Sequence, residues 1–206
     1  MPQQKYRTVL MFGPPGVGKG TQGQVLGGLP GFRHVSAGDC FRAFNVGSPA
    51  AKESNRYIER GELVPDDLAF RVWKQAMERM IDDDQFSPET DVLVLDGFPR
   101  SLVQAAALDD HIDALRLISL VSSDENAMVE RIKTRALQSG RPDDADEAII
   151  RHRFNVYRQN TEPVLRYYPD ELKCQVDALQ SPTEVLRCVL DCIIPVQSLR
   201  LSSATN

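Results

Sequence analysis

Residues 13–21 read GPPGVGKGT, a run of glycines and prolines that carries one lysine and ends on a threonine. The apolar run over residues 8–12 predicts a buried strand before it, and the residues after it can form a helix. A strand, a glycine loop with one lysine and a helix start bind polyphosphate, because backbone N–H groups and the helix N-terminus face the anion. We expect the phosphate-binding residues to be Gly16, Val17, Gly18, Lys19, Gly20 and Thr21.

Three further segments carry polar residues that could serve the same ligand: SAGDCFR at 36–42, GELVPD at 61–66 and DGFPR at 96–100. DGFPR directly follows an apolar run that is typical of a strand covered on both faces. Asp96 therefore stands at the carboxyl end of a strand, where ligands bind in open α/β sheets and where a carboxylate can hold a magnesium-bound water. Each segment alone could be an ordinary turn or helix cap, but their order after the phosphate loop indicates one nucleotide site.

The charge of the chain points to the same kind of ligand. A formal net charge of −5 over 206 residues argues against a nucleic-acid or anionic-membrane partner. The cations are 18 arginines and 6 lysines. Arginine binds phosphate oxygens better than lysine does, because its planar guanidinium can donate two parallel hydrogen bonds. The four cysteines show neither metal-ligand nor disulfide spacing, and no stretch is long and apolar enough to span a membrane, so we expect a cytoplasmic protein.

Short apolar runs alternate with longer helical stretches, which is the pattern of a parallel α/β sheet. We predict strands at Val9–Phe12, Phe32–Ser36, Val92–Asp96, Leu115–Val121 and Lys173–Asp177. We predict helices near Gly20–Leu26, Asp66–Ile81, Leu102–Ile112, Asp124–Leu137, Glu147–Tyr167 and Pro182–Cys192. Asp124 and Ser181 are predicted N-caps. The tail from Pro195 is expected to be frayed.

Two regions interrupt this alternation. Residues 38–65 are helical and polar, and they lie between the second strand and a long helix. Residues 138–146, QSGRPDDAD, form a short loop between two long helices.

The loop pattern G-x-P-G-x-G-K-G-T, followed by SAGD, GELV and DGFPR, resembles the adenylate kinase family of nucleoside monophosphate kinases over residues 9 to about 185. The resemblance implies an α/β P-loop NTPase fold with a five-stranded parallel sheet flanked by helices. It also implies a small monophosphate-binding insertion at about 36–65 and a short, metal-free lid at about 138–146. The implied reaction moves the γ-phosphoryl group of ATP, bound with Mg²⁺, to AMP. By analogy with the family we expect a monomer.

The resemblance assigns a role to each matching position. The residues implied in catalysis are Lys19, Arg100, Arg131, Arg141 and Arg153. Those implied in ATP binding, beyond the phosphate loop, are Arg131, Arg135 and Gln180. Those implied in AMP binding are Ala37, Arg42, Glu62, Leu63, Val64, Gly97, Phe98, Pro99, Arg100, Gln104, Arg141 and Arg153. Asp143 and Asp144 would orient the lid arginines. The chain is expected to hold no metal directly, although Asp39 and Asp96 could reach Mg²⁺ through water.

The reaction needs no general base, because the acceptor is a phosphate whose second pKa is about 6 and which is largely ionised at neutral pH. His34, His111 and His152 therefore need no catalytic role. The requirement is instead the in-line placement of two polyanions and the neutralisation of charge on the transferring group.

Two departures from the family pattern leave alternatives open. Ala37 stands where adenylate kinases have threonine and is typical of UMP/CMP kinases, whereas Gln104 matches the adenine-reading glutamine. We expect AMP as the acceptor, with UMP or CMP as the alternative. Counting back from residues 161–164 selects Arg153 as the lid arginine, and counting forward from Asp144 selects His152.

A nucleotide-binding module without turnover is a further alternative. A GTPase or motor ATPase lacks support, because the chain has no N-K-x-D motif and DGFPR would be unexplained.

Overall fold

The protein is described by a computed structural model that covers residues 4–44, 49–139, 144 and 146–203. Within these residues a single five-stranded sheet has the order β2-β3-β1-β4-β5, and every pairing is parallel. The strands are β1 Tyr6–Phe12, β2 Phe32–Ser36, β3 Val92–Asp96, β4 Ile112–Val121 and β5 Lys173–Asp177. This arrangement confirms the predicted α/β fold.

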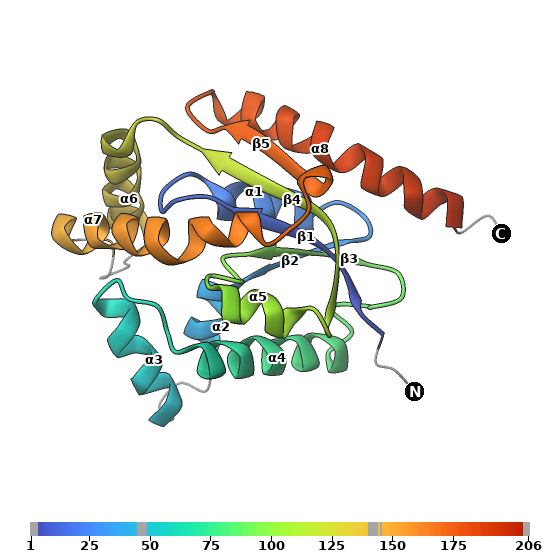
Figure 1. The fold of residues 1–206 in the computed structure, drawn as a ribbon, viewed down its shortest axis with the longest axis horizontal. Helices are drawn as coiled ribbons and strands as arrows, with labels where there is room; N and C mark the ends of the chain where they lie inside the picture. Colours follow the sequence, from blue (N-terminus) through green and yellow to red (C-terminus); the bar gives the residue numbers. More distant parts are fainter. Residues whose placement is uncertain (1–3, 45–48, 140–143, 145, 204–206) are drawn as a thin grey trace.

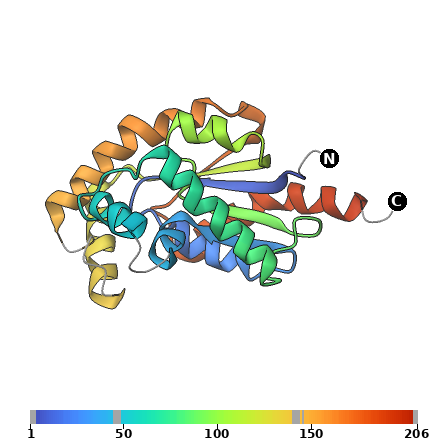
Figure 2. The same ribbon diagram turned by 90° about the horizontal axis from the view of Figure 1, so that it is seen from below.

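Helices cover both faces of the sheet, so the chain builds two cores. Alternate residues of a strand point to opposite faces. Leu10 and Phe12 of β1 accordingly join one core, with side chains of α4 and α5, while Val9 and Met11 join the other, with side chains of α1, α6, α7 and α8. The view from below shows the same layers (Figure 2). The α-helices are α1 Lys19–Gly27, α2 Ala37–Ala43, α3 Pro49–Glu59, α4 Asp66–Asp82, α5 Leu102–Leu108, α6 Glu125–Ser139, α7 Glu147–Val156 and α8 Pro182–Ser203.

Three predicted helix boundaries are wrong. α5 ends at Leu108 rather than residue 112, because Ile112 already pairs with Tyr6 of β1. α8 continues through Pro195 to Ser203, where we expected a helix end and a frayed tail. The stretch predicted as one helix over 147–167 is α7 followed by a π-helix, Tyr157–Thr161, and a 3₁₀-helix, Glu162–Arg166.

Two predicted strands begin too late, since β1 starts at Tyr6 and β4 at Ile112. The two predicted N-caps are confirmed. The carboxylate of Asp124 accepts a hydrogen bond from the backbone of Ala127 at 2.9 Å, and the hydroxyl of Ser181 accepts one from the backbone of Glu184 at 3.4 Å.

The carboxyl ends of the strands meet on one side of the molecule. The loop after β1, the short helices α2 and α3, and the adjoining ends of α6 and α7 lie on this side, at the left of Figure 1. The start of β1 and the end of α8 lie on the opposite side. No helix in the described part of the chain is long and apolar enough to cross a membrane.

Candidate active site

The loop between β1 and α1 packs so closely on its surroundings that glycine is required. Gly16 has a φ of +77°, and a Cβ atom there would lie 2.6 Å from the backbone oxygen of Met128 in α6. A Cβ at Gly13 would lie 2.4 Å from the backbone oxygen of Leu120 at the end of β4. The predicted phosphate loop is therefore fixed by the sheet on one side and by α6 on the other.

Lys19 folds back onto this loop. Its ammonium donates to the backbone oxygens of Gly13, at 2.7 Å, and Pro14, at 3.1 Å. Burial lowers the pKa of Lys19 to about 8, Asp96 opposes this change, and neighbouring arginines add to it. The arginines whose charges act on Lys19 are Arg100, Arg135 and Arg153. Burial and the neighbouring cations destabilise the charged form of Lys19, so a bound anion would stabilise it.

Asp96, the last residue of β3, lies beside the phosphate loop as predicted. Its carboxylate is nearly buried, and its Oδ2 atom would lie 3.7 Å from a Cβ built on Gly20. The Nε2 atom of His34 lies 3.8 Å from the same oxygen. His34 packs tightly against Gly23 and Gly27 of α1, which agrees with a structural role for this histidine.

Arg100 is held by its backbone and by its side chain. Its N–H donates to Oε1 of Gln104 at 2.7 Å, and its carbonyl accepts from the hydroxyl of Thr161 at 3.0 Å. Its guanidinium Nε donates to the carbonyl of Gly97 at 2.7 Å. Burial and the charge of Arg153 lower the pKa of Arg100, and Asp96 acts in the opposite direction. The charges of Arg153 and Asp96 therefore act on both Arg100 and Lys19, and the charge of Arg42 acts on Arg100 as well.

Asp144 joins two of the predicted arginines. Its carboxylate is fully buried and lies 2.7 Å from Arg135 of α6 through one oxygen and 2.7 Å from Arg153 of α7 through the other. Of the two lid arginines that this acid is expected to orient, the structure places Arg153 on its carboxylate. Arg141 and Asp143 lie outside the described residues, so the structure does not place them.

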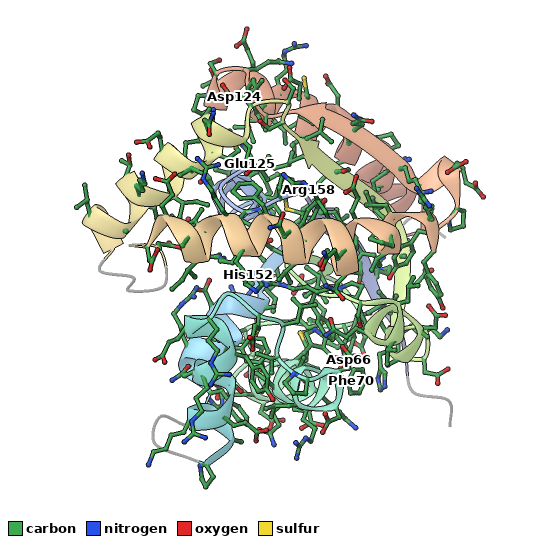
Figure 3. All side chains as sticks on the ribbon, turned by 60° about the vertical axis from the view of Figure 1, so that its left-hand side comes forward. Asp66, Phe70, Asp124, Glu125, His152 and Arg158 are labelled. Carbon is green, nitrogen blue, oxygen red and sulfur yellow. The ribbon has the colours of Figure 1, made fainter. Side chains whose placement is uncertain are left out.

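Arg153 and its neighbours on α7 have different partners. Arg151 pairs instead with Glu147 at 2.8 Å and Glu125 at 3.4 Å. Figure 3 shows Glu125 on α6 close to Arg158, with which it forms a further ion pair, and His152 on the α7 side of the same view. Of Arg151, His152 and Arg153, only Arg153 is joined to Asp144 and acts on both Lys19 and Arg100.

Arg131 extends from α6 to the loop after β5, where it donates to the backbone oxygen of Ala178 at 3.0 Å. Gln180 follows two residues later and is half-buried. Arg131 and the segment that holds Gln180 are therefore neighbours, as a shared ATP subsite requires.

The predicted acceptor residues surround α2 and the segment before α4. Arg42 pairs with Asp39 and folds over Gly38, whose Cβ would lie 3.3 Å from the guanidinium. Because Asp39 is exposed and engaged by Arg42, it is a weaker candidate than Asp96 for a magnesium-bound water. A Cβ at Gly61 would lie 2.8 Å from Cγ of Arg153, so this segment touches α7. Among the other predicted contacts, Ala37, Val64, Phe98 and Pro99 are buried, Leu63 and Gly97 are half-buried, and Glu62 is exposed.

Gln104 has its side-chain amide engaged within the protein. Its Oε1 accepts from Arg100, and its Nε2 donates to Asp66 at 2.8 Å. Asp66 is a partner of Gln104 that the sequence did not reveal. The two residues are 38 positions apart, and no local pattern links them.

The chain is similar to known proteins over most of its length. The family model described as "Adenylate kinase" matches residues 11–173. A protein of Mycolicibacterium smegmatis named adenylate kinase is 38% identical over 191 residues, which cover 90% of this chain and 98% of the relative.

The chain belongs to the adenylate kinase family.

Two further members of the adenylate kinase family are similar over most of their length. The adenylate kinase of Mycolicibacterium paratuberculosis is 41% identical over 186 residues, which cover 86% of this chain and 93% of the relative. The adenylate kinase of Thermus thermophilus is 39% identical over 186 residues, with 87% and 92% covered. The matched span includes every arginine of the candidate site.

Proposed function

We propose that this protein transfers the γ-phosphoryl group of ATP to AMP and releases two molecules of ADP. The observation that carries the proposal is the group of cations whose charges act on Lys19 at the carboxyl ends of the strands, two of which share the carboxylate of Asp144. Lys19 comes from the phosphate loop, Arg100 from the end of β3, Arg135 from α6 and Arg153 from α7. Two mutually repelling polyanions need such a site in order to meet.

The residues supply charge and position rather than acid–base chemistry. The acceptor phosphate carries its own nucleophilic oxygen, so no proton must be removed from it. Lys19 and the loop amides would hold the ATP phosphates, with Arg131 and Gln180 toward the base. Arg42 and Arg100 would hold the acceptor phosphate. Residues 62–64 would lie against the acceptor base, with Gln104 on its edge and Ala37 beside it.

Mg²⁺ is the cofactor we propose with ATP. The residues present fit the ion, since Asp96 is a nearly buried carboxylate beside the loop and Thr21 offers a hydroxyl at the start of α1. Magnesium prefers a few such oxygen ligands together with phosphates and water. When bound, it would neutralise charge on the phosphates of ATP.

The division of the chain also remains a proposal. We assign residues 36–65 to the monophosphate-binding insertion and residues 138–146 to the lid, whose closure would exclude water from the transferring group. A monomeric state and a cytoplasmic location are predictions of the same kind.

A pyrimidine monophosphate is the second candidate acceptor. Ala37 favours it, because the chain lacks a hydroxyl at the position where adenylate kinases have threonine. The names of the relatives support AMP instead, as does the presence of glutamine at position 104.

The test of the site is the substitution Arg100→Ala. An arginine acting on a transferring phosphoryl group contributes about 10³–10⁵-fold to the rate, so we expect ADP formation to fall by at least about 10³-fold. The matched control is Arg71→Ala on α4, where the arginine is exposed and pairs only weakly with Asp67. Turnover by Arg100→Ala close to that of Arg71→Ala would contradict the proposal.

A further inference from the structure

Asp66 links the start of α4 to the residues after β3. Its Oδ1 atom accepts two hydrogen bonds, each of 2.8 Å, from the hydroxyl of Ser101 and from Nε2 of Gln104. Gln104 is 3% exposed, and its Oε1 accepts from the backbone of Arg100 at 2.7 Å. Figure 3 shows Asp66 on α4 in the region next to α5.

These two partners fix the direction of the Gln104 amide. A backbone N–H can only donate, so it requires the amide oxygen at Arg100. An ionised carboxylate can only accept, so it requires the amide nitrogen at Asp66. If the amide of Gln104 were flipped, its NH₂ group would face the backbone N–H of Arg100 and its oxygen would face the carboxylate of Asp66. Both hydrogen bonds of this buried side chain would then be lost.

The fixed amide keeps one N–H donor and one oxygen lone pair for a ligand, in a single spatial order. Adenine presents a ring-nitrogen acceptor beside an amino donor, whereas uracil presents a ring N–H donor beside a carbonyl acceptor. A free glutamine amide could match either edge by turning over. A fixed amide can pair with only one of these two bases. Against the other base it places donor against donor and acceptor against acceptor, which leaves buried polar groups unpaired.

We propose that Asp66 is a positioning residue that sets base specificity, because it fixes Gln104 in the orientation that accepts AMP and rejects UMP. This inference rests on the proposed function, in which Gln104 contacts the acceptor base. Only Pro65 separates Asp66 from residues 62–64, so Asp66 connects the proposed base-binding segment, through Gln104, to the backbone of Arg100. The hydroxyl of Thr161 holds the other side of that backbone at 3.0 Å.

The experiment compares Asp66→Ala with Asp67→Ala. Asp67 is the next residue in the same helical turn, and its side chain is 79% exposed with a single long ion pair to Arg71. For each variant, kcat and KM are measured with AMP and with UMP at saturating Mg-ATP. A hydrogen bond to a charged group corresponds to roughly tenfold or more in an equilibrium. We therefore expect Asp66→Ala to lower the AMP-over-UMP ratio of kcat/KM about tenfold, mainly through a higher KM for AMP, and Asp67→Ala to keep the ratio.

Asp66→Asn provides a second variant should the alanine variant fail to fold, as judged by circular dichroism. Its side chain keeps an oxygen that can accept from Gln104 but also offers an amide N–H to the flipped form, so we expect the ratio to fall by about threefold. An unchanged ratio in a folded Asp66 variant would overturn the inference, and so would an equal loss with AMP and UMP. Absence of AMP conversion by the unmodified protein would instead overturn the proposed function.

Discussion

The surroundings of Lys19 change the pH at which its side chain is charged. In the free protein, burial lowers its pKa to about 8, so the ammonium is charged at neutral pH and loses its proton as the pH rises above 8. Only the charged form attracts phosphate, and bound phosphate favours that form. We therefore expect the affinity for ATP to fall several-fold between pH 8 and pH 9.5, which isothermal titration calorimetry can follow.

The control for this pH dependence is Lys19→Met, which carries no charge at any pH. It should bind ATP more weakly and with little change over the same range. A constant affinity of the unmodified protein from pH 7 to pH 9.5 would show that Lys19 does not bind the phosphates as a cation.

Asp144 joins Arg135 of α6 to Arg153 of α7 through one buried carboxylate. Asp144→Ala would leave Arg135 and Arg153 without their shared carboxylate. These side chains are 40% and 22% exposed, so water can partly replace it. We expect the free energy of unfolding to fall by about 2 kcal/mol and turnover to fall with it. Chemical denaturation measures the first effect and ADP formation the second.

An exposed ion pair on α6 serves as the control for Asp144. Glu130 is 72% exposed and pairs with Lys133 at 3.3 Å. Glu130→Ala should leave both the free energy of unfolding and turnover within error. Equal behaviour of the two variants would mean that Asp144 does not organise the arginines.

At the scale of elements, the phosphate loop depends on its contact with α6. Gly16→Ala would place a Cβ atom 2.6 Å from the backbone of Met128 while φ is +77°. We expect the free energy of unfolding to fall by about 1–3 kcal/mol and ATP binding to be lost, because the loop must move away from α6. Thermal unfolding with and without ATP measures both effects.

Gly28 at the end of α1 offers a matched control. Its φ is −83°, and a Cβ there would come no closer than 3.4 Å to another atom. Gly28→Ala should leave stability unchanged or slightly higher, and ATP should still raise its melting temperature. Retained ATP binding by Gly16→Ala would contradict the importance of the loop's packing on α6.

At the scale of the whole molecule, the sequence predicts the elements whose signals are local. β2, β3 and β5 have the predicted bounds, because each is a short apolar or alternating run between turns. β1 begins earlier, at Tyr6, since this ring packs on Phe86 with centroids 5.5 Å apart. α8 continues past Pro195 because Val196, the next residue, is buried in the core that Val9 and Met11 join. Such contacts between distant segments have no local signature.

In the candidate site, too, residues with a local sequence signal could be predicted and contacts between distant segments could not. The loop residues, Arg100 and Arg153 could be predicted from motifs and from a resemblance to a family. The pairing of Asp66 with Gln104 could not be predicted, because it joins residues 38 positions apart, one at the start of α4 and the other in the first turn of α5. The shared carboxylate between α6 and α7 was anticipated only as an acidic pair near arginines.

The most direct test of the proposed reaction is a nucleotide analysis of the purified protein with Mg-ATP and, in separate reactions, AMP, UMP, CMP or no acceptor. We expect AMP to be converted to ADP much faster than either pyrimidine nucleotide is phosphorylated, and ATP alone to be stable. Faster phosphorylation of UMP or CMP, or no acceptor-dependent turnover at all, would contradict it.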